Sequence, residues 1–255
     1  MDFRETFGRL DPGLWTDGYL PAWSSRAAAA ATLTTGAAGL ELSIPVGQGA
    51  WCPDTHDPPL RVSAIHSANR SGPVGSTDAQ QPFREGLTVR EEQATMLGFA
   101  PHFGTIAVTA SAELDARSMF SAWLVGLEDR PDRCGEICLI EVFGDAVDGA
   151  VAAVGQGIHA FRDPVLREDF SAKVRTIDVA RPHTYAVGWA PGRVEFLIDG
   201  VATRVCDQAP DYPMMLILGV FDFPGREGGI PGFVPRMRVT EIVGTGLGAG
   251  SLVAP

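Results

Sequence analysis

The chain has 255 residues, of which 45% are hydrophobic, and it carries 30 glycines, 19 prolines and a formal net charge of −11. The apolar content can fill a sizeable core, and the glycine and proline content indicates many turns without the level typical of disorder. The acidic charge argues against general binding to nucleic acid or to an anionic membrane, because proteins that bind these partners are normally basic. No apolar run reaches the roughly 18 residues of a membrane-spanning helix.

The beginning of the chain does not resemble an export signal. Asp2 and Glu5 stand where such a signal has basic residues, and no apolar segment follows them. We therefore expect a cytoplasmic protein, or a secreted one if a signal has been removed.

The cysteines and histidines predict neither a disulfide framework nor a metal centre. Cys134 and Cys138 would lie about 13 Å apart on an extended strand, which is too far for a disulfide, and their spacing fits no zinc motif. We expect the four cysteines to be buried thiols or residues without a role. No ligand pair at helical spacing is formed by the histidines His56, His66, His102, His159 and His183.

In chain order, the first predicted elements are extended. The alanine-rich segment 27–31 favours an extended conformation, with a short helix as the alternative, because five alanines are too few to nucleate a helix alone. A turn at 36–39 leads to a predicted strand at 40–45. Residues 47–82 are rich in Pro, Gly and Ser and predict loops, with one strand near 60–66. Such loops commonly rim a binding face in all-β proteins.

The middle of the chain carries the clearest strand patterns. Residues 104–113 and 183–189 alternate between apolar and polar side chains, which indicates strands with one face on a core. The Asp-Gly pair at 199–200 predicts a hairpin between strands at 194–198 and 201–205.

The last elements complete an all-β pattern. Residues 214–221 are apolar on both faces, which indicates a strand inside a two-layer structure, and alternation at 237–243 predicts a final strand. The glycines of 244–250 do not form a dinucleotide loop, because no helix follows them. We predict a single β-sandwich domain of two antiparallel sheets over residues 1–245, followed by a flexible tail at 246–255.

Two glutamates interrupt an apolar strand at 135–144, which reads Gly-Glu-Ile-Cys-Leu-Ile-Glu-Val-Phe-Gly. Glu136 and Glu141 would face opposite sides of a regular strand, but one β-bulge between them would bring both to the same face. Two carboxylates about 5–5.5 Å apart in a cleft suit a retaining glycosidase. Two solvent-facing acids on an edge strand are the alternative, and the spacing alone does not decide between them.

The same segment resembles the Glu-x-Asp-x-x-Glu signature of glycoside hydrolase family 16, which includes laminarinases and lichenases. Other motifs resemble those of the family in the same order: Met1–Phe7 with Leu10, Asp11 and Trp15, then 103–106, 120–124, 157–159, 183–189 with 199–200, and 212–218. The resemblance implies a concanavalin A-like β-jelly roll. It also implies a retaining glycoside hydrolase or transglycosylase, without a cofactor, that acts on a β-linked glucan or a related polysaccharide or oligosaccharide.

The resemblance also implies roles for single residues. Glu136 would be the nucleophile and Glu141 the general acid/base. Trp123 would stack near the scissile sugar and His159 would form a hydrogen bond within the cleft, although a core position for Trp123 and a structural rim position for His159 are the alternatives. Trp51, in the long loop region, is a candidate sugar platform.

The sequence departs from the family signature at Cys138, which stands where the family has an Asp that hydrogen-bonds the nucleophile. A thiol is a weaker hydrogen-bond partner, and the flanking carboxylates disfavour a reactive thiolate. Asp222, near the end of its strand, is a candidate to supply the missing polar group. The calcium site of the family is not matched either, since Pro235 or Arg236 falls where an acid is expected.

The departure at Cys138 leaves two alternatives to catalysis open. One is a non-catalytic or weakly active carbohydrate-binding protein on the same fold. The other is a β-sandwich interaction module without a sugar site.

Overall fold

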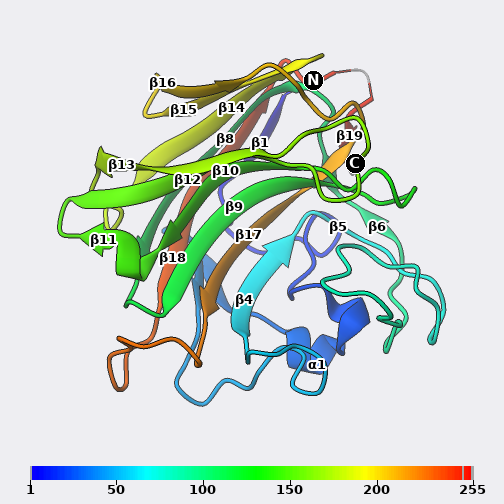
Figure 1. Cartoon of the computed structure of the whole chain (residues 1–255), viewed down its shortest axis with the longest axis horizontal. Coiled ribbons are helices and arrows are strands. Elements are labelled where there is room, and N and C mark those ends of the chain that lie inside the picture. The colour runs from blue at the N-terminus through cyan, green and yellow to red at the C-terminus, as the bar shows by residue number, and fades with distance from the viewer. Residues whose placement is uncertain (1, 249, 254–255) are drawn as a thin grey trace.

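The computed structural model describes residues 2–248 and 250–253, and two antiparallel sheets form its body (Figure 1). The first sheet has eight strands in the order β16-β15-β14-β8-β18-β3-β2, with β1 paired to β18. Its strands are β1 (Phe3–Glu5), β2 (Thr32–Gly36), β3 (Gly39–Ser43), β8 (Gly104–Glu113), β14 (His183–Ala190), β15 (Arg193–Ile198), β16 (Val201–Cys206) and β18 (Arg236–Thr245).

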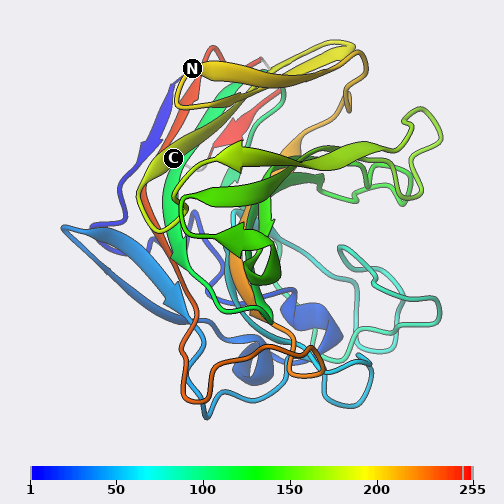
Figure 2. The ribbon, with the colours of Figure 1, turned by 60° about the vertical axis from the view of Figure 1, so that its left-hand side comes forward.

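The second sheet has seven strands in the order β11-β12-β10-β9-β17-β4, with β13 paired to β12. Its strands are β4 (Arg61–His66), β9 (Ser118–Gly126), β10 (Glu136–Phe143), β11 (Val147–Asp148), β12 (Val151–His159), β13 (Asp169–Thr176) and β17 (Met214–Asp222). Figure 2 separates the two layers and the loops that project beyond this second sheet. The all-β jelly-roll sandwich predicted from the sequence is confirmed.

Short elements complete the chain. Two small strand pairs are formed by β5 (Ala68–Asn69) with β6 (Met96–Leu97) and by β7 (Phe99–Ala100) with β19 (Leu252–Val253). The helical elements are η1 (Pro21–Trp23), α1 (Arg26–Ala29) and η2 (Gly144–Ala146). None of the helices in the described part of the chain has the length and apolar character needed to span a membrane.

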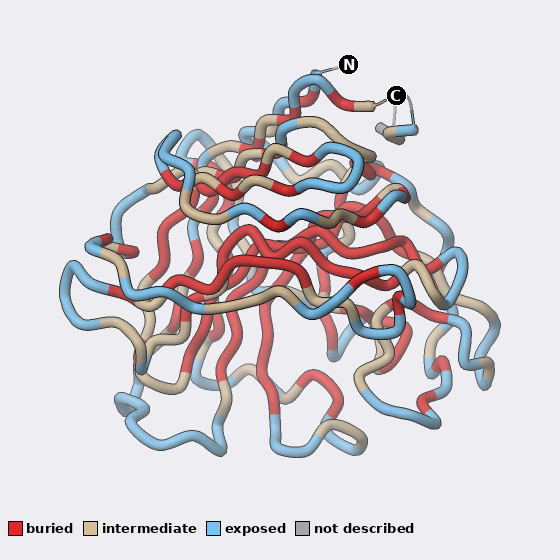
Figure 3. Tube along the Cα trace, turned by 45° about the horizontal axis from the view of Figure 1, so that its top comes forward, coloured by how far each residue is buried: buried red, intermediate tan, exposed pale blue. Residues whose placement is uncertain are grey.

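The main core lies between the two sheets. Alternate side chains of each strand point into it, and Phe120 and Leu124 of β9 lie fully buried in the same cluster as Tyr185 and Val187 of β14. Figure 3 shows that buried residues are concentrated in the strands and exposed residues in the surrounding loops. Removal of these apolar side chains from water is the dominant stabilising contribution to such a fold.

A second apolar cluster lies on the other face of the seven-stranded sheet. Met215, Ile217 and Phe221 of β17 belong to it, together with Trp23 of η1 and Trp51 from the loop before β4. Loops therefore cover part of this face, and the part that they leave open forms the cleft described below.

Most predicted strands are confirmed. The segments predicted at 104–113, 183–189 and 214–221 correspond to β8, β14 and β17. The predicted hairpin is β15 and β16, which pair in antiparallel register. The strand expected near 60–66 is β4.

The favoured prediction for the alanine-rich segment is wrong in part. Residues Arg26–Ala29 form one turn of helix, α1, and the strand begins only at Thr32. The Ser25 side chain accepts a hydrogen bond from the Ala28 backbone N–H at 3.1 Å, which caps this turn. Ala29 is fully buried, so packing stabilises a turn too short to form alone.

The described part of the predicted flexible tail lies against the body. Leu247 is buried in the main core, and the Gly248 N–H donates to the His102 carbonyl at 3.1 Å. Strand β19 then pairs with β7. Residues 249 and 254–255 of the predicted tail lie outside the described residues.

Candidate active site

A β-bulge in β10 brings the two glutamates to one face of the seven-stranded sheet. The pairing of β10 with β9 shifts between Cys138 and Ile140, so Leu139 is an extra residue that has no partner on β9. Leu139 and Ile140 both lie in the core between the sheets. Glu136 and Glu141 therefore point to the opposite face, as the bulge predicted from the sequence requires.

Five of the predicted site residues line one cavity of about 310 Å³ on this face, namely Trp123, Glu136, Cys138, Glu141 and His159. Aromatic side chains provide much of the remaining wall: Tyr19, Phe143, Phe221 and Phe223. Apolar and aromatic walls with a few converging polar groups are typical of small-molecule sites. The alternative of two acids on a solvent-facing edge strand is wrong, because β10 lies between β9 and β12.

A second cavity, of about 210 Å³, extends the first. The two cavities share Tyr19, Gln81 and Glu136, and the second is also lined by Phe83, Glu128, Phe161 and Arg162. Glu136 thus lies where the two cavities meet, and together they form an elongated cleft. An elongated cleft can accept several units of a linear chain on both sides of the junction.

Glu136 is a buried acid in an acidic neighbourhood, with 8% of its surface exposed. Burial raises its pKa to about 8, with further contributions from the negative charges of Glu141 and Glu128. A hydrogen bond donated by Gln81 Nε2 to Glu136 Oε1 acts in the opposite direction. Two neighbouring carboxyl groups in such a site do not ionise together readily, so the pair tends to retain a proton near neutral pH.

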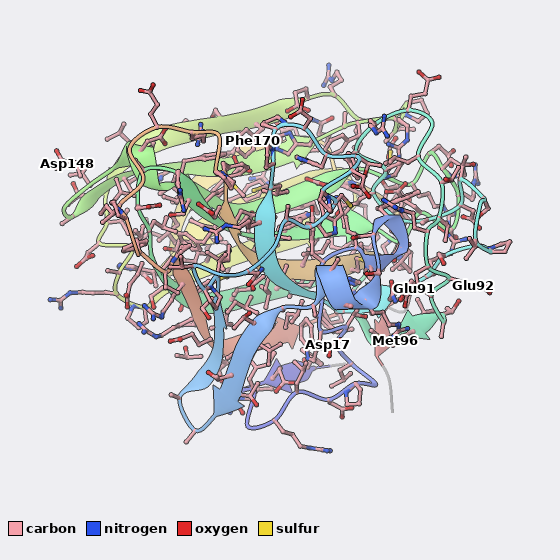
Figure 4. The ribbon with its side chains drawn as sticks, turned by 90° about the horizontal axis from the view of Figure 1, so that it is seen from below. Asp17, Glu91, Glu92, Met96, Asp148 and Phe170 are labelled. Atoms are coloured by element: carbon pink, nitrogen blue, oxygen red, sulfur yellow. The ribbon has the colours of Figure 1, made fainter. Side chains whose placement is uncertain are left out.

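Glu141 shares the cavity with His159. Burial raises the pKa of Glu141, whereas the charge of His159 lowers it. His159 itself is fixed from two sides: its Nδ1 lies 2.7 Å from Glu168 Oε1, and its ring stacks on Phe170 of β13 with centroids 4.3 Å apart. Phe170 is labelled in Figure 4. The imidazole is therefore held at one wall of the cavity.

Cys138 lies between the glutamates on the same strand and is buried. Burial, followed by the charges of Glu141 and Glu136, raises the pKa of this thiol well above its ordinary value. The thiol therefore stays protonated at neutral pH, as the flanking acids led us to expect. All four cysteines, Cys52, Cys134, Cys138 and Cys206, are free and buried, which confirms the prediction of buried thiols.

Trp123 combines the two positions that the sequence left open. It belongs to the apolar cluster on the cleft face, where its ring lies 6.0 Å from Phe221, and it also lines the cavity. Its indole Nε1 is buried without a hydrogen-bond partner among the described residues. An indole N–H in this position can donate to a ligand.

Two predicted site residues do not line the cleft. Trp51 is 2% exposed and packs against Tyr19 and Phe83, with ring centroids 4.8 and 5.1 Å away, so it supports these aromatic residues from behind instead of offering a sugar platform. Asp222 is completely buried and is engaged by two arginines.

The ion pairs of Asp222 explain its position. Arg61 Nε donates to its Oδ2 at 2.6 Å, and Arg117 Nε lies 2.6 Å from its Oδ1. In β17 the side chain of Val220 faces the main core and that of Phe221 faces the cleft, so Asp222 returns to the core side. It therefore cannot replace the polar group that Cys138 does not supply.

Several cleft residues were missed by the sequence analysis. Phe143 follows Glu141 by two residues on β10, and this spacing could have placed it on the cleft face. Tyr19 and Gln81 come from loops, where no periodicity marks the direction of a side chain. Glu128 and Arg162 also come from loops, and they form an ion pair with 2.6 Å between Glu128 Oε2 and Arg162 Nη2.

A metal centre has no evident ligand set in the part of the chain that the structure describes. Within residues 2–248 and 250–253, no group of three or more His, Cys, Asp or Glu side chains could hold a metal ion. The groups that the cleft presents include carboxyl groups, an imidazole and hydrogen-bond donors.

Known structures share this architecture. The GlcNAcα1-4Gal-releasing endo-β-galactosidase of Clostridium perfringens superposes with a TM-score of 0.80 at 24% identity, over 95% of this chain and 61% of that one. The chain thus spans less than two thirds of that enzyme. The laminarinase catalytic domain of Thermotoga maritima superposes with a TM-score of 0.61 at 16% identity, over 95% and 96% of the two chains. A Crh5 transglycosylase in complex with NAG gives a TM-score of 0.62 at 17% identity, over 98% and 86%.

The sequence itself also matches a family model. None of the curated proteins compared with the chain matches it. The model of glycosyl hydrolases family 16 matches residues 87–223, which is more than half of the chain and includes the bulged strand with both glutamates. The chain belongs to glycosyl hydrolases family 16.

Proposed function

We propose that the protein is a retaining, endo-acting glycoside hydrolase or transglycosylase that cleaves a β-linked glycan with Glu136 and Glu141. The observation that carries this proposal is the bulge in β10, which presents both carboxyl groups in one aromatic cleft. Family membership supports an activity on carbohydrate.

The proposed reaction has two displacement steps. In the first, the Glu136 carboxylate attacks the anomeric carbon, the glycosidic C–O bond breaks, and Glu141 donates its proton to the departing oxygen. In the second, Glu141 accepts a proton from water or from a sugar hydroxyl, whose oxygen attacks the anomeric carbon. The ester bond to Glu136 breaks and the carboxylate is restored.

The other cleft residues have supporting roles in this proposal. Trp123 and the phenylalanines offer apolar faces against which sugar rings can pack, and the unpartnered indole N–H of Trp123 is a donor for a sugar hydroxyl. His159, held by Glu168 and Phe170, keeps a positive or hydrogen-bonding group beside Glu141.

The substrate class is proposed as β-linked glucans or galactans, polymeric or oligomeric. The printed names of the similar structures include an endo-β-galactosidase, a laminarinase and a transglycosylase. A test panel must therefore include β-1,3-glucan, mixed-linkage β-glucan and β-galactosides, and it must measure transfer to added oligosaccharides as well as hydrolysis.

The first test is release of reducing ends from this panel by the native protein and by Glu136→Gln and Glu141→Gln. We expect the native protein to act on at least one panel member and Glu136→Gln to lose turnover while it still binds that glycan. The turnover rate of Glu141→Gln should be lower than that of the native protein by about a hundredfold or more, because general acid/base catalysis contributes at least that much to the rate. Unchanged turnover in both variants would contradict the proposed roles.

The non-catalytic alternative is motivated by Cys138. If the native protein binds glycans without turnover and Cys138→Asp gains activity, then the fold and both glutamates are suited to catalysis but the native chain is a binding protein. If native protein and Cys138→Asp neither turn over nor bind any panel member, both carbohydrate proposals fail.

A further inference from the structure

We propose that Gln81 is a positioning residue that holds the Glu136 carboxylate in its attacking form and orientation, and that the Glu128–Arg162 ion pair fixes Gln81 for this task. The proposal rests on the proposed function, because it concerns the same carboxylate.

The first observation is the contact itself. Gln81 Nε2 donates a hydrogen bond to Glu136 Oε1. Among the described residues, no other hydrogen bond to the Glu136 side chain is present, and Cys138, its neighbour on the same face, does not donate one to it. The amide of Gln81 is therefore the donor on which the orientation of this carboxyl group depends.

The second observation is the backbone of Gln81, which has φ of 49°, in the left-handed region that a residue with a side chain rarely adopts. Its N–H donates to Glu128 Oε1 at 2.8 Å. The other carboxylate oxygen of Glu128 accepts from Arg162 Nη2 at 2.6 Å. Such backbone conformations persist where the surroundings determine them, and they cluster at functional sites.

The third observation is that the preceding residue is also fixed. Gln80 is 3% exposed. Its carbonyl accepts from Trp23 Nε1 at 2.6 Å, and its side-chain Nε2 lies 3.3 Å from the Leu127 carbonyl. The loop therefore presents Gln81 from a rigid base, which is what precise positioning of a reacting group requires.

The charges around Glu136 explain why a donor is needed there. Donation of a hydrogen bond to a carboxylate favours the ionised form, whereas nearby negative charges disfavour it. The charged and titratable groups that surround Glu136 are Glu141 and Cys138 on its own strand, His159 on β12, Tyr19, and the loop residues Glu128, Arg162 and Glu168. Three of these seven groups are carboxyl groups whose charges, together with burial, raise the pKa of Glu136, so Gln81 opposes a neighbourhood that favours the protonated form.

Gln81 also has a free acceptor. Its Oε1 is buried without a hydrogen-bond partner among the described residues, and the residue lines both cavities. A sugar hydroxyl at the junction of the two cavities could donate to this oxygen. The same side-chain amide would then contact both the substrate, through Oε1, and the proposed nucleophile, through Nε2.

The test compares Gln81→Ala with the native protein in the pH dependence of kcat/KM. Without the donor, the pKa of Glu136 rises, so the acid limb of the profile should move up by about one pH unit, equivalent to about tenfold lower activity below the limb. The effect should fall mainly on kcat. Gln48→Ala is the matched control, because Gln48 is also a loop glutamine whose Nε2 donates a hydrogen bond, here to the Val62 carbonyl, but it lies outside the cleft.

The support of Gln81 by Glu128 is tested by Glu128→Asp, which keeps the negative charge near Glu136 but shortens the side chain whose Oε1 accepts from the Gln81 N–H. This variant should shift the acid limb of the kcat/KM profile in the same direction as Gln81→Ala. The double variant should lose no more activity than Gln81→Ala alone, because both changes act through the hydrogen bond from Gln81 to Glu136. A uniform loss of activity at every pH, with the acid limb in place, would overturn the proposal and leave a purely structural role for Gln81.

A readout without turnover separates this proposal from the proposed function. We expect Gln81→Ala, relative to the native protein, to lose additional stability as the pH rises through about 8, where native Glu136 ionises. A native protein without activity that shows this pH-dependent loss contradicts the proposed function alone. An active native protein in which Gln81→Ala changes neither the pH profile nor the pH dependence of unfolding contradicts the role of Gln81 alone.

Discussion

At the scale of single residues, the main feature of the site is that burial disfavours the ionised carboxyl group that the proposed mechanism needs. As the proposed nucleophile, Glu136 would have to be ionised to attack, yet burial and two neighbouring acids raise its pKa to about 8. Such perturbed carboxyl groups in a cleft are typical of functional sites. The proposed nucleophile therefore predicts an activity that increases as pH rises toward about 8.

The same group predicts a pH-dependent stability. The pKa of Glu136 rises from 4.5, its ordinary value, to about 8 in the folded protein, so the folded state keeps a proton that the unfolded chain has already lost. The free energy of unfolding therefore decreases as pH rises from about 4.5 to about 8. Glu136→Gln removes this pH-dependent loss. The change that it causes in the free energy of unfolding should therefore be more favourable at pH 8 than at pH 4.5, by on the order of 2–4 kcal/mol.

Urea unfolding of the native protein and Glu136→Gln at both pH values measures this difference. Glu227→Gln, at an exposed glutamate in the loop after β17, is the control and should show no such dependence. An equal effect of Glu136→Gln at pH 4.5 and pH 8 would contradict the burial of this carboxyl group as the source of its shift.

The residues that the sequence analysis placed wrongly show where local patterns lose their value. Asp222 has the sequence context of a cleft residue, but its two partners, Arg61 and Arg117, are distant in sequence and meet it only in the fold. Trp51 lies in a loop, and its burial depends on Tyr19 and Phe83 from other loops. No periodicity predicts contacts of this kind.

At the scale of elements, the bulged strand depends on its neighbour β12. Gly157 of β12 pairs with Cys138, directly beside the bulge, and has φ of 145°. A Cβ at this position would lie 2.2 Å from the Asp169 carbonyl oxygen and 2.7 Å from the Phe170 Cα, both of them backbone atoms of β13. The close approach of β12 and β13 therefore requires glycine here, and it places Phe170 behind His159.

Gly157→Ala is accordingly expected to destabilise the protein by about 1–3 kcal/mol and to raise KM, because β13 must move and carry Phe170 away from His159. Thermal unfolding and glycan kinetics measure the two effects. Gly188→Ala in β14 is the matched control, since a Cβ there would meet nothing within 4 Å and no positive φ is involved. Equal stability of the two variants would contradict this explanation of the close strand packing.

The elements that could be predicted are those with regular alternation. Strands β8, β14, β15 and β18 each have one face on the core and therefore display period-two patterns. Strand β13 was missed because most of its residues are exposed or half-buried, without alternation. Its role depends on pairing with β12, which the sequence does not reveal.

At the scale of the whole molecule, the sheet supplies the reacting groups and distant loops supply the surroundings. Glu136, Glu141, Trp123 and His159 come from three adjacent strands and were predicted together, because their motifs follow the order of the family. The roles of these residues remain predictions. Tyr19 and Gln81 complete the cleft from loops of the N-terminal third, whose direction is set by tertiary packing.

The anomeric configuration of the first product tests the central claim most directly. Proton NMR during the first minutes of cleavage of an active panel member distinguishes the newly released anomer before mutarotation equilibrates it. The two-step mechanism through Glu136 predicts that the β-anomer appears first, and that Glu136→Gln forms no product. Initial release of the α-anomer, or β-product formed at native rates by Glu136→Gln, would contradict the account.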